Sequence, residues 1–356
     1  MKKRLKLKKE PFIKLIIGII VFIIVLTLGI NYYNKRYERK LKKIGYTSTE
    51  IKILKTNKTD LSIVSKYDYI PVIASIIENE NYINDNLKQY LDIYQNNRDI
   101  EAIIYIVNNN IEHEYSDKLV SLIHSDYFIL NRLDRYMKYD KSTDANIIVR
   151  DVNSNIDFDF YTNVTTTDTS KGKLMLVNKY YSLDDSYSVE DLVKVDNLYA
   201  NLDGNMLNNE AYGALINMIN AADNEGYNIR LNYSYRDYAT QESVYNDYKK
   251  NRGQEYADAY AARPGHSEHQ TGYAIDIGVQ SRYATGSFKN SKEYTWMKDN
   301  SYKYGYILRY PEGMDNITGY SFEAWHYRYV GVDVATYIYE HNITFDEYYA
   351  YFIEKN

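Results

Sequence analysis

One long apolar run dominates the beginning of the hydropathy pattern. From Phe12 to Ile30 the only charged side chain is Lys14, which is close enough to the end of the run for its ammonium group to reach the lipid headgroups. A helix rises about 1.5 Å per residue, so these residues cover about 28 Å, close to the roughly 30 Å hydrocarbon core of a bilayer. Polar residues follow the run without a small-residue cleavage site, so the pattern predicts a basic tail and an uncleaved transmembrane anchor in residues 1–34.

Short amphipathic patterns follow in residues 35–152. Thr47 and Glu50 have the spacing of a capping box, which predicts a short helix over Thr49–Leu54. Further apolar groups at helical spacing are separated by Asn and Asp residues, without a clear repeat at a fixed period. Because no catalytic residues stand out in this region, we expect a helical spacer, or a module that docks an unknown protein.

The pattern changes after a polar stretch at residues 153–173, which predicts a linker or an outer loop. After it, segments with strand periodicity alternate with segments with helix periodicity, and two helical stretches end the chain. The predicted elements are a strand at 229–234, a helix at 239–248, a strand at 272–277, and helices at about 332–340 and 345–354. Residues 174–356 are therefore expected to form a domain with mixed strands and helices.

Composition narrows the chemistry that the chain can carry. Its 356 residues include no cysteine, which excludes disulfides, thiolate metal ligands, iron–sulfur clusters and a cysteine nucleophile. Any metal must be held by carboxylates and by some of only six histidines. The 43 tyrosines, together with frequent Asn, Ile and Lys, indicate an AT-rich coding bias.

Charge is distributed unevenly between the start of the chain and the rest. The first 43 residues carry 13 Lys or Arg and two acidic residues, a net charge of +11, so the remainder carries −16 of the total of −5. Binding to phosphate backbones requires a surplus of Lys and Arg at the contact. We therefore expect no nucleic-acid partner.

Candidate catalytic residues concentrate in three segments, at residues 234–241, 264–276 and 319–329. His269, Asp276 and His326 would make a three-ligand zinc set with a fourth position left for water. Glu323 lies near the last histidine, where a general base for that water could be. On one regular strand Glu323 and His326 would face opposite sides, so at least one of them is expected at a strand end, loop or bulge.

These segments resemble the signature blocks of the zinc D-alanyl-D-alanine carboxypeptidases of the VanY type. The blocks are S-x-H-x-x-G-x-A-x-D, an upstream Y-R-x-x-x-x-Q and a downstream E-x-W-H, and the matching stretches are RPGHSEHQTGYAIDIG, SYRDYATQ and ITGYSFEAWHYRYVG. The resemblance extends from Leu174 to the C-terminus, about half of the chain. Two positions depart from it, Tyr273 where the family commonly has Leu and Ala324 where it commonly has Pro. Neither change removes a reactive group, although proline would restrict the backbone beside Glu323.

The resemblance implies an α+β catalytic domain, a small antiparallel sheet flanked by helices as in DD-peptidase and hedgehog-type zinc folds. It also implies one catalytic Zn²⁺ and a role for each matching residue. The implied ligands are His269, Asp276 and His326, the general base is Glu323, the oxyanion is stabilised by Arg236, and the substrate pocket is lined by Arg236, Gln241 and Ser267. A guanidinium suits this oxyanion role because it stays charged while negative charge develops in the transition state.

The implied function is removal of the C-terminal D-Ala from peptidoglycan stem peptides, by Glu-assisted attack of a zinc-activated water. Because this substrate lies outside the cytoplasmic membrane, we expect a single-pass protein of the bacterial cell membrane with a cytoplasmic N-terminus and an extracytoplasmic catalytic domain. The bilayer and the stem peptide are then its expected partners.

Three alternatives remain open, of which the least supported is a division or signalling adaptor with incidental zinc, since it rests only on the anchor and the helical region. The motifs do not separate this activity from L,D-carboxypeptidase action on tetrapeptide stems. A non-catalytic wall-binding or scaffold protein with a vestigial hydrolase domain is the alternative from another class, but the intact set of His269, Asp276, His326 and Glu323 argues against it.

Overall fold

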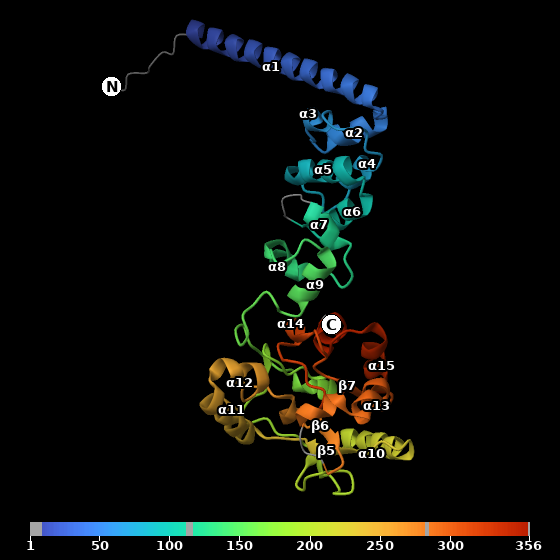
Figure 1. Ribbon diagram of the computed structural model, residues 1–356. Coiled ribbons are helices and arrows are strands. Elements are labelled where there is room, and N and C mark those ends of the chain that lie inside the picture. The colour runs from blue at the N-terminus through green and yellow to red at the C-terminus, as the bar shows by residue number, and fades with distance from the viewer. Residues whose placement is uncertain (1–8, 112–116, 282–284, 355–356) are drawn as a thin grey trace, which may run out of the picture. The chain divides into compact units, whose positions relative to one another are not determined.

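The computed structural model describes residues 9–111, 117–281 and 285–354 (Figure 1). Contacts within the chain divide it into two compact units, Met1–Ser125 and Asp126–Asn356. The first unit is helical, and the second combines helices with small sheets.

A long helix opens the first unit. Helix α1 (Lys9–Ile44) has exposed apolar side chains along the stretch that begins at Ile13, and its C-terminal end carries the fully buried Leu41. Leu41 packs in one core with Tyr46 and Leu54, so the end of α1 is part of the helical unit rather than a free tether. The other helices of this unit are α2 (Ser48–Thr56), α3 (Leu61–Val64), α4 (Ile73–Ile77), α5 (Leu87–Asn97), α6 (Ile100–Asn108) and α7 (Asp117–Ile123).

The predicted capping box is present at the start of α2. The Thr47 hydroxyl accepts a hydrogen bond from the Glu50 backbone amide at 3.2 Å, and the Glu50 carboxylate accepts one from the Thr47 amide at 2.6 Å. These two bonds satisfy amide groups that the helix itself leaves unpaired. The prediction of a helix here is confirmed, with one more residue at its start and two more at its end.

The chain contains a repeated helical unit, although its sequence shows no clear repeat at a fixed period. Each copy begins with a short 3-10 turn and a helix, and a buried tyrosine in that helix contacts the ring of an aromatic residue that precedes it. A nine-residue helix follows, capped by an aspartate side chain. An asparagine with positive φ comes after this second helix. The corresponding residues are Tyr82/Phe128, Leu87/Leu133, Tyr90/Tyr136, Asp99/Asp144 and Asn110/Asn155. The offset between copies changes by one residue after the tyrosine, so no single period fits both halves.

The second copy packs within the second unit, through α8 (Leu133–Lys138) and α9 (Ala145–Asn153). Tyr127 stacks on Tyr351 near the C-terminus, with ring centroids 3.9 Å apart, and Arg132 forms an ion pair with Glu354 at 2.7 Å. The contact division therefore falls after Ser125, whereas the sequence-based division was placed after residue 152.

The expected linker at residues 153–173 contains ordered structure. It includes β1 (Thr165–Thr166), which pairs in parallel with β2 (Tyr181–Ser182), and the start of a 3-10 helix at Thr169–Leu174. A second small sheet pairs β3 (Leu192–Lys194) with β4 (Met206–Asn208) in antiparallel fashion. These short pairings have no apolar alternation of their own, which explains why sequence patterns did not reveal them.

A four-stranded antiparallel sheet forms the centre of the second unit, in the order β5-β6-β8-β7. Its strands are β5 (Ile229–Tyr233), β6 (Ala274–Val279), β7 (Tyr306–Leu308) and β8 (His326–Tyr329). The strand predicted at 229–234 is confirmed. The one predicted at 272–277 begins two residues later, because Gly272 takes a left-handed conformation, with φ of +76°, at the end of the preceding 3-10 turn.

Side-chain alternation separates the two faces of this sheet. Ile275, Ile277 and Tyr327 pack into the main core with α10 (Asn209–Asn224) and α13 (Lys292–Asn300). Neighbours in a strand point to opposite faces, so Asp276 and His326 face away from that core. The remaining helices of this unit are α11 (Tyr238–Arg252), α12 (Gln254–Tyr260), α14 (Asp315–Thr318), α15 (Val332–His341) and α16 (Phe345–Tyr348), which continues as a π-helical turn over Tyr349–Ile353.

Candidate metal centre

Three of the predicted site residues come from adjacent parts of the central sheet. Asp276 on β6 is the direct partner of His326, the first residue of β8, in the antiparallel register. His269 lies in the 3-10 helix Glu268–Thr271, which leads through Gly272 into β6. Residues that are far apart in sequence therefore meet because β6 and β8 pair at this position.

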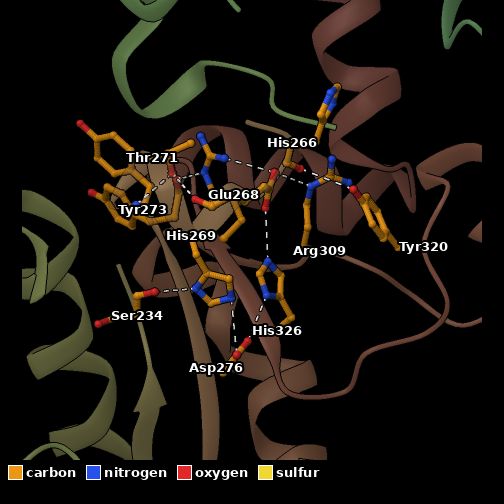
Figure 2. A network of polar contacts seen from close by, with 12 residues as sticks. Ser234, His266, Glu268, His269, Thr271, Tyr273, Asp276, Arg309, Tyr320 and His326 are labelled. Atoms are coloured by element: carbon orange, nitrogen blue, oxygen red, sulfur yellow. Dashed lines mark hydrogen bonds and ion pairs between the residues drawn. The ribbon is translucent and has the colours of Figure 1, made fainter. Parts of the chain in front are cut away.

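The donor atoms of these residues form a compact set, as Figure 2 shows. Nε2 of His269 lies 3.4 Å from Oδ2 of Asp276, and Nδ1 of His326 lies 3.0 Å from Oδ1 of the same carboxylate. One donor atom from each residue can be chosen so that all three lie within 4.8 Å of one another. The three side chains are buried, with 3–6% of each residue exposed.

The orientation of His269 fits a metal ligand. Its Nδ1 lies 2.6 Å from the carbonyl oxygen of Ser234, the residue after β5. A carbonyl can only accept, so Nδ1 must donate, and the Nε2 lone pair is left facing Asp276 and His326. Two imidazoles and one carboxylate without thiolates are a donor set that suits Zn²⁺ and leaves a position for water.

Charges within the site differ strongly between the two histidines. Burial, with Arg236 nearby, lowers the pKa of His269 to about 4, so this imidazole is neutral at neutral pH. Burial also acts to lower the pKa of His326, but contacts with the carboxylates of Asp276 and Glu268 outweigh it and raise the pKa to about 9. Burial would raise the pKa of the Asp276 carboxyl, but the two histidines hold it well below its usual range.

Glu323 lies in the turn that leads into β8, where its carbonyl oxygen accepts a hydrogen bond from the His326 amide at 3.2 Å. Glu323 therefore lies outside the strand and His326 at its first position, as expected if the two side chains are to reach the same site despite their odd separation in sequence. The Glu323 side chain lines the same cavity as the three candidate ligands. Burial raises its pKa to about 7, which suits a group that must take up and return a proton near neutral pH.

Arg236 and Gln241 are placed by the start of α11. Asp237 caps this helix through a 2.8 Å hydrogen bond from the Thr240 amide, so it does not neutralise Arg236. Instead, Nη1 of Arg236 donates to Oε1 of Gln241 at 2.9 Å, and Nε2 of Gln241 donates to the Ala262 carbonyl at 2.8 Å. Among the described residues, Nε of Arg236 has no hydrogen-bond partner although it is buried.

A cavity of about 530 Å³ connects these groups. Arg236, Gln241, Ser267 and Glu323 line it together with the candidate ligands. Aromatic side chains form much of the remaining wall, namely those of Trp325, Tyr233, Tyr248, Tyr260, Tyr310 and Tyr320. All seven residues expected from the sequence at the site are therefore brought to one cavity.

The sequence motifs did not reveal a buried ionic network behind the candidate ligands. Glu268, Arg309, Arg328 and Asp346 are all at most 2% exposed, and Glu268 approaches His326. Burial would raise the pKa of Glu268, but Arg309 and Arg328 hold it well below its usual range. Arg309 and Asp346 lie outside the matching stretches, and Arg328 lies inside one of them but is not a motif position, so only the fold brings the three residues together.

Comparisons with known proteins agree with this arrangement. A family model described as "VanY: D-alanyl-D-alanine carboxypeptidase" matches residues 204–332. The chain is 39% identical over 184 residues to YodJ of Bacillus subtilis (strain 168), which is named as a carboxypeptidase, covering 49% of this chain and 66% of that protein. It is 32% identical over 190 residues to a D-alanyl-D-alanine carboxypeptidase of Enterococcus faecalis, covering 51% and 67%.

Among solved structures, that of the LdcB LD-carboxypeptidase is 35% identical, with a TM-score of 0.50, over 53% of this chain and 91% of that one. The second unit therefore has an LdcB-like fold of small sheets and helices. The chain belongs to the VanY family of D-alanyl-D-alanine carboxypeptidases. It spans about two thirds of the length of the two curated relatives described above.

Proposed function

We propose that this chain is a zinc-dependent carboxypeptidase that removes the C-terminal D-Ala from peptidoglycan stem peptides. The observation that carries the proposal is the group of three buried donors from His269, Asp276 and His326, within 4.8 Å of one another. They lie at a cavity that Glu323 and Arg236 also line. One ion held by the three donors would polarise the scissile carbonyl and lower the pKa of the attacking water.

Glu323 moves the proton in the proposed reaction. Its carboxylate accepts a proton from water as the oxygen attacks the carbonyl carbon, and it returns that proton to the amine nitrogen of the leaving D-Ala. The new C–O bond forms first and places negative charge on the former carbonyl oxygen, and the C–N bond then breaks, which leaves a shortened peptide with a free carboxylate. Burial favours the protonated form of Glu323, which supports its role as the group that carries the proton from water to the leaving nitrogen.

Arg236 and Gln241 act on the substrate rather than on the proton. The Arg236 guanidinium is oriented by Gln241, and the residue lines the cavity. It can therefore donate to the oxygen that gains negative charge during the reaction. Gln241 itself is anchored to the Ala262 carbonyl, and Ser267 contributes to the pocket wall.

A second candidate activity is L,D-carboxypeptidase action on tetrapeptide stems. The similarity to the LdcB LD-carboxypeptidase favours it, since that structure aligns over 91% of its own length. Both activities release D-Ala by the same chemistry and differ in the residue that precedes the scissile bond.

We further propose that α1 anchors the protein in the bacterial cell membrane. By length and composition, it is the one helix among the described residues that could cross a bilayer. Its apolar side chains from Ile13 to Ile30 are exposed, in contrast to the buried Leu41 at its end. The basic tail would then be cytoplasmic and the catalytic unit extracytoplasmic, and protease protection of the N-terminal tail in intact cells would test this topology.

The proposed activity is tested by incubating the full chain with defined penta- and tetrapeptide stems, before and after zinc removal by a chelator. We expect D-Ala release from the pentapeptide, its loss in the metal-free protein and its return with one equivalent of zinc. Release from the tetrapeptide alone would favour the second candidate. Equal release with and without zinc would contradict the proposed mechanism.

A further inference from the structure

Glu268 is a fully buried carboxylate that directly precedes His269 in the chain. Although Glu268 and His269 are neighbours in the chain, the Glu268 side chain reaches toward His326. Oε2 of Glu268 lies 3.4 Å from Nε2 of His326. Figure 2 draws this contact as a dashed line between the two side chains. Glu268 therefore connects the 3-10 helix that carries His269 with the imidazole ring of His326.

Two guanidinium groups hold the other oxygen of this carboxylate. Nε of Arg309 donates to Oε1 of Glu268 at 2.7 Å, and Nη1 of Arg328 lies 3.1 Å from the same oxygen. With Oε1 fixed in this way, Oε2 is turned toward His326. Arg328 is itself anchored, since its Nη2 donates to the carbonyl oxygens of Lys173 at 3.1 Å and Met175 at 2.9 Å.

Asp346 at the start of α16 completes the network. It accepts two hydrogen bonds from Arg309, at 2.6 and 3.2 Å, and a third from Nδ2 of Asn178 at 2.7 Å. Two carboxylates and two guanidinium groups thus balance each other in a place where an unpaired charge would be costly. Such a network resists any movement of Glu268, because displacing it would leave buried arginines without acceptors.

The contacts of His326 define which of its nitrogens faces a metal. Nδ1 lies 3.0 Å from Oδ1 of Asp276, within the cluster of candidate donors, whereas Nε2 faces Glu268. A carboxylate on the outer nitrogen holds the proton there and leaves the inner lone pair free for the ion. His269 has the same arrangement with the opposite nitrogens, because its Nδ1 is held by the Ser234 carbonyl.

We propose that Glu268 is a positioning residue for the metal site. It holds the His326 ring with Nδ1 toward the ion, and Arg309, Arg328 and Asp346 hold Glu268 in place. The proposal rests on the zinc site of the proposed function and assigns the network a role in ligand orientation rather than in the reaction itself.

The test uses the full chain in detergent and the variant Glu268→Asp. This change keeps the negative charge that Arg309 and Arg328 require, but it shortens the side chain by one methylene group and withdraws the carboxylate from His326. We expect the zinc dissociation constant, measured by competition with a chelator, to rise by about 10- to 100-fold. The absorption spectrum of the cobalt-substituted protein should also change, because it reports the ligand geometry.

The more disruptive variant Glu268→Gln removes the charge and is expected to weaken zinc binding at least as much, with a lower unfolding midpoint. If it fails to fold, Glu268→Asp decides the question. The matched control is Asp223→Asn, which breaks the ion pair with Arg230 between α10 and β5, where Nη1 and Oδ1 are 2.9 Å apart. That variant should keep the wild-type zinc dissociation constant.

A folded Glu268→Asp variant with wild-type zinc affinity and cobalt spectrum would overturn the proposal. This outcome is distinct from failure of the proposed function. A wild-type protein that binds zinc but releases no D-Ala would remove the peptidase activity and leave the positioning role, which is measured by metal affinity.

Discussion

At the scale of single residues, Arg236 is the group whose environment points most clearly to a ligand. Its guanidinium is oriented by one neutral side chain, Gln241, and its nearest acidic atom is Oδ2 of Asp276 at 3.7 Å. A buried Nε without a partner among the described residues is costly unless substrate satisfies it. We therefore propose that the Arg236 guanidinium gains a further acceptor when substrate binds.

We predict that Arg236→Lys lowers kcat/KM for D-Ala release by about 10²- to 10³-fold, because an ammonium cannot reproduce the planar donors of a guanidinium. Steady-state kinetics on a pentapeptide would measure the effect, with zinc content checked in parallel. The control Arg252→Lys, at the exposed end of α11, should retain wild-type kinetics. An active Arg236→Lys enzyme would show that the guanidinium has no part in the transition state.

The sequence indicated these candidate site residues because their types and spacing have few other uses in a chain without cysteine. His269, Asp276, His326 and Glu323 could be proposed from that chemistry and from the resemblance. Glu268 could not, although it lies within the same block. Its role depends on Arg309, Arg328 and Asp346, which reach it only through strand pairing and the docking of α16.

At the scale of elements, glycines set where several segments end and turn. Gly305 follows a 3-10 turn and precedes β7, with φ of +82°. A Cβ at this position would lie 2.7 Å from Cε2 of Tyr329 and 3.0 Å from the backbone of Gly331. Gly213, inside α10, would in contrast place a Cβ in open space.

We predict opposite effects for the two alanine substitutions. Gly305→Ala should lower the free energy of unfolding of the second unit by about 2–4 kcal/mol, from left-handed strain and overpacking. Gly213→Ala should raise it by about 0.5–1 kcal/mol, because alanine favours the helix. Both tryptophans, Trp296 and Trp325, lie in the second unit, so urea unfolding followed by tryptophan fluorescence would report on it. Equal stabilities for the two variants would contradict this account of the turn.

Long periodic elements were predictable, whereas short ones were not. The strand at 229–234 and the helix at the start of α11 were recognised because each has a single clear period. The repeated helical unit was missed because the offset between its copies changes by one residue, and the final helix was predicted too regular, since it turns π-helical after Tyr348. Such features depend on packing rather than on local preference.

At the scale of the whole molecule, buried tyrosines affect stability, in addition to the tyrosines that line the cavity. Burial raises the pKa of Tyr46 and Tyr136 to about 12, and it raises those of Tyr306 and Tyr320 well above their usual value. The folded protein therefore keeps protons that the unfolded chain loses near pH 10. The stability that these groups contribute is complete below pH 10 and falls as the pH rises above it.

We predict that these tyrosines change the urea midpoint of unfolding little between pH 8 and 9 and lower it steeply above about pH 10. Each fully buried tyrosine should cost about 1.4 kcal/mol per pH unit in that range. Absorbance at 295 nm should show a class of phenols that ionises only as the protein unfolds. If all tyrosines ionised together near pH 10 with the fold intact, the burial of these side chains would be contradicted.

The central claim is that a single proton-transferring carboxylate, Glu323, works beside a zinc ion held by His269, Asp276 and His326. Its most direct test is mass spectrometry of a pentapeptide stem after incubation with the full-chain Glu323→Gln variant, with bound zinc quantified in the same sample. We predict one zinc per chain and a loss of D-Ala release of about 10²- to 10⁴-fold, while Glu312→Gln, on an exposed loop, stays active. Undiminished release of D-Ala by the zinc-loaded Glu323→Gln protein would contradict this role of Glu323.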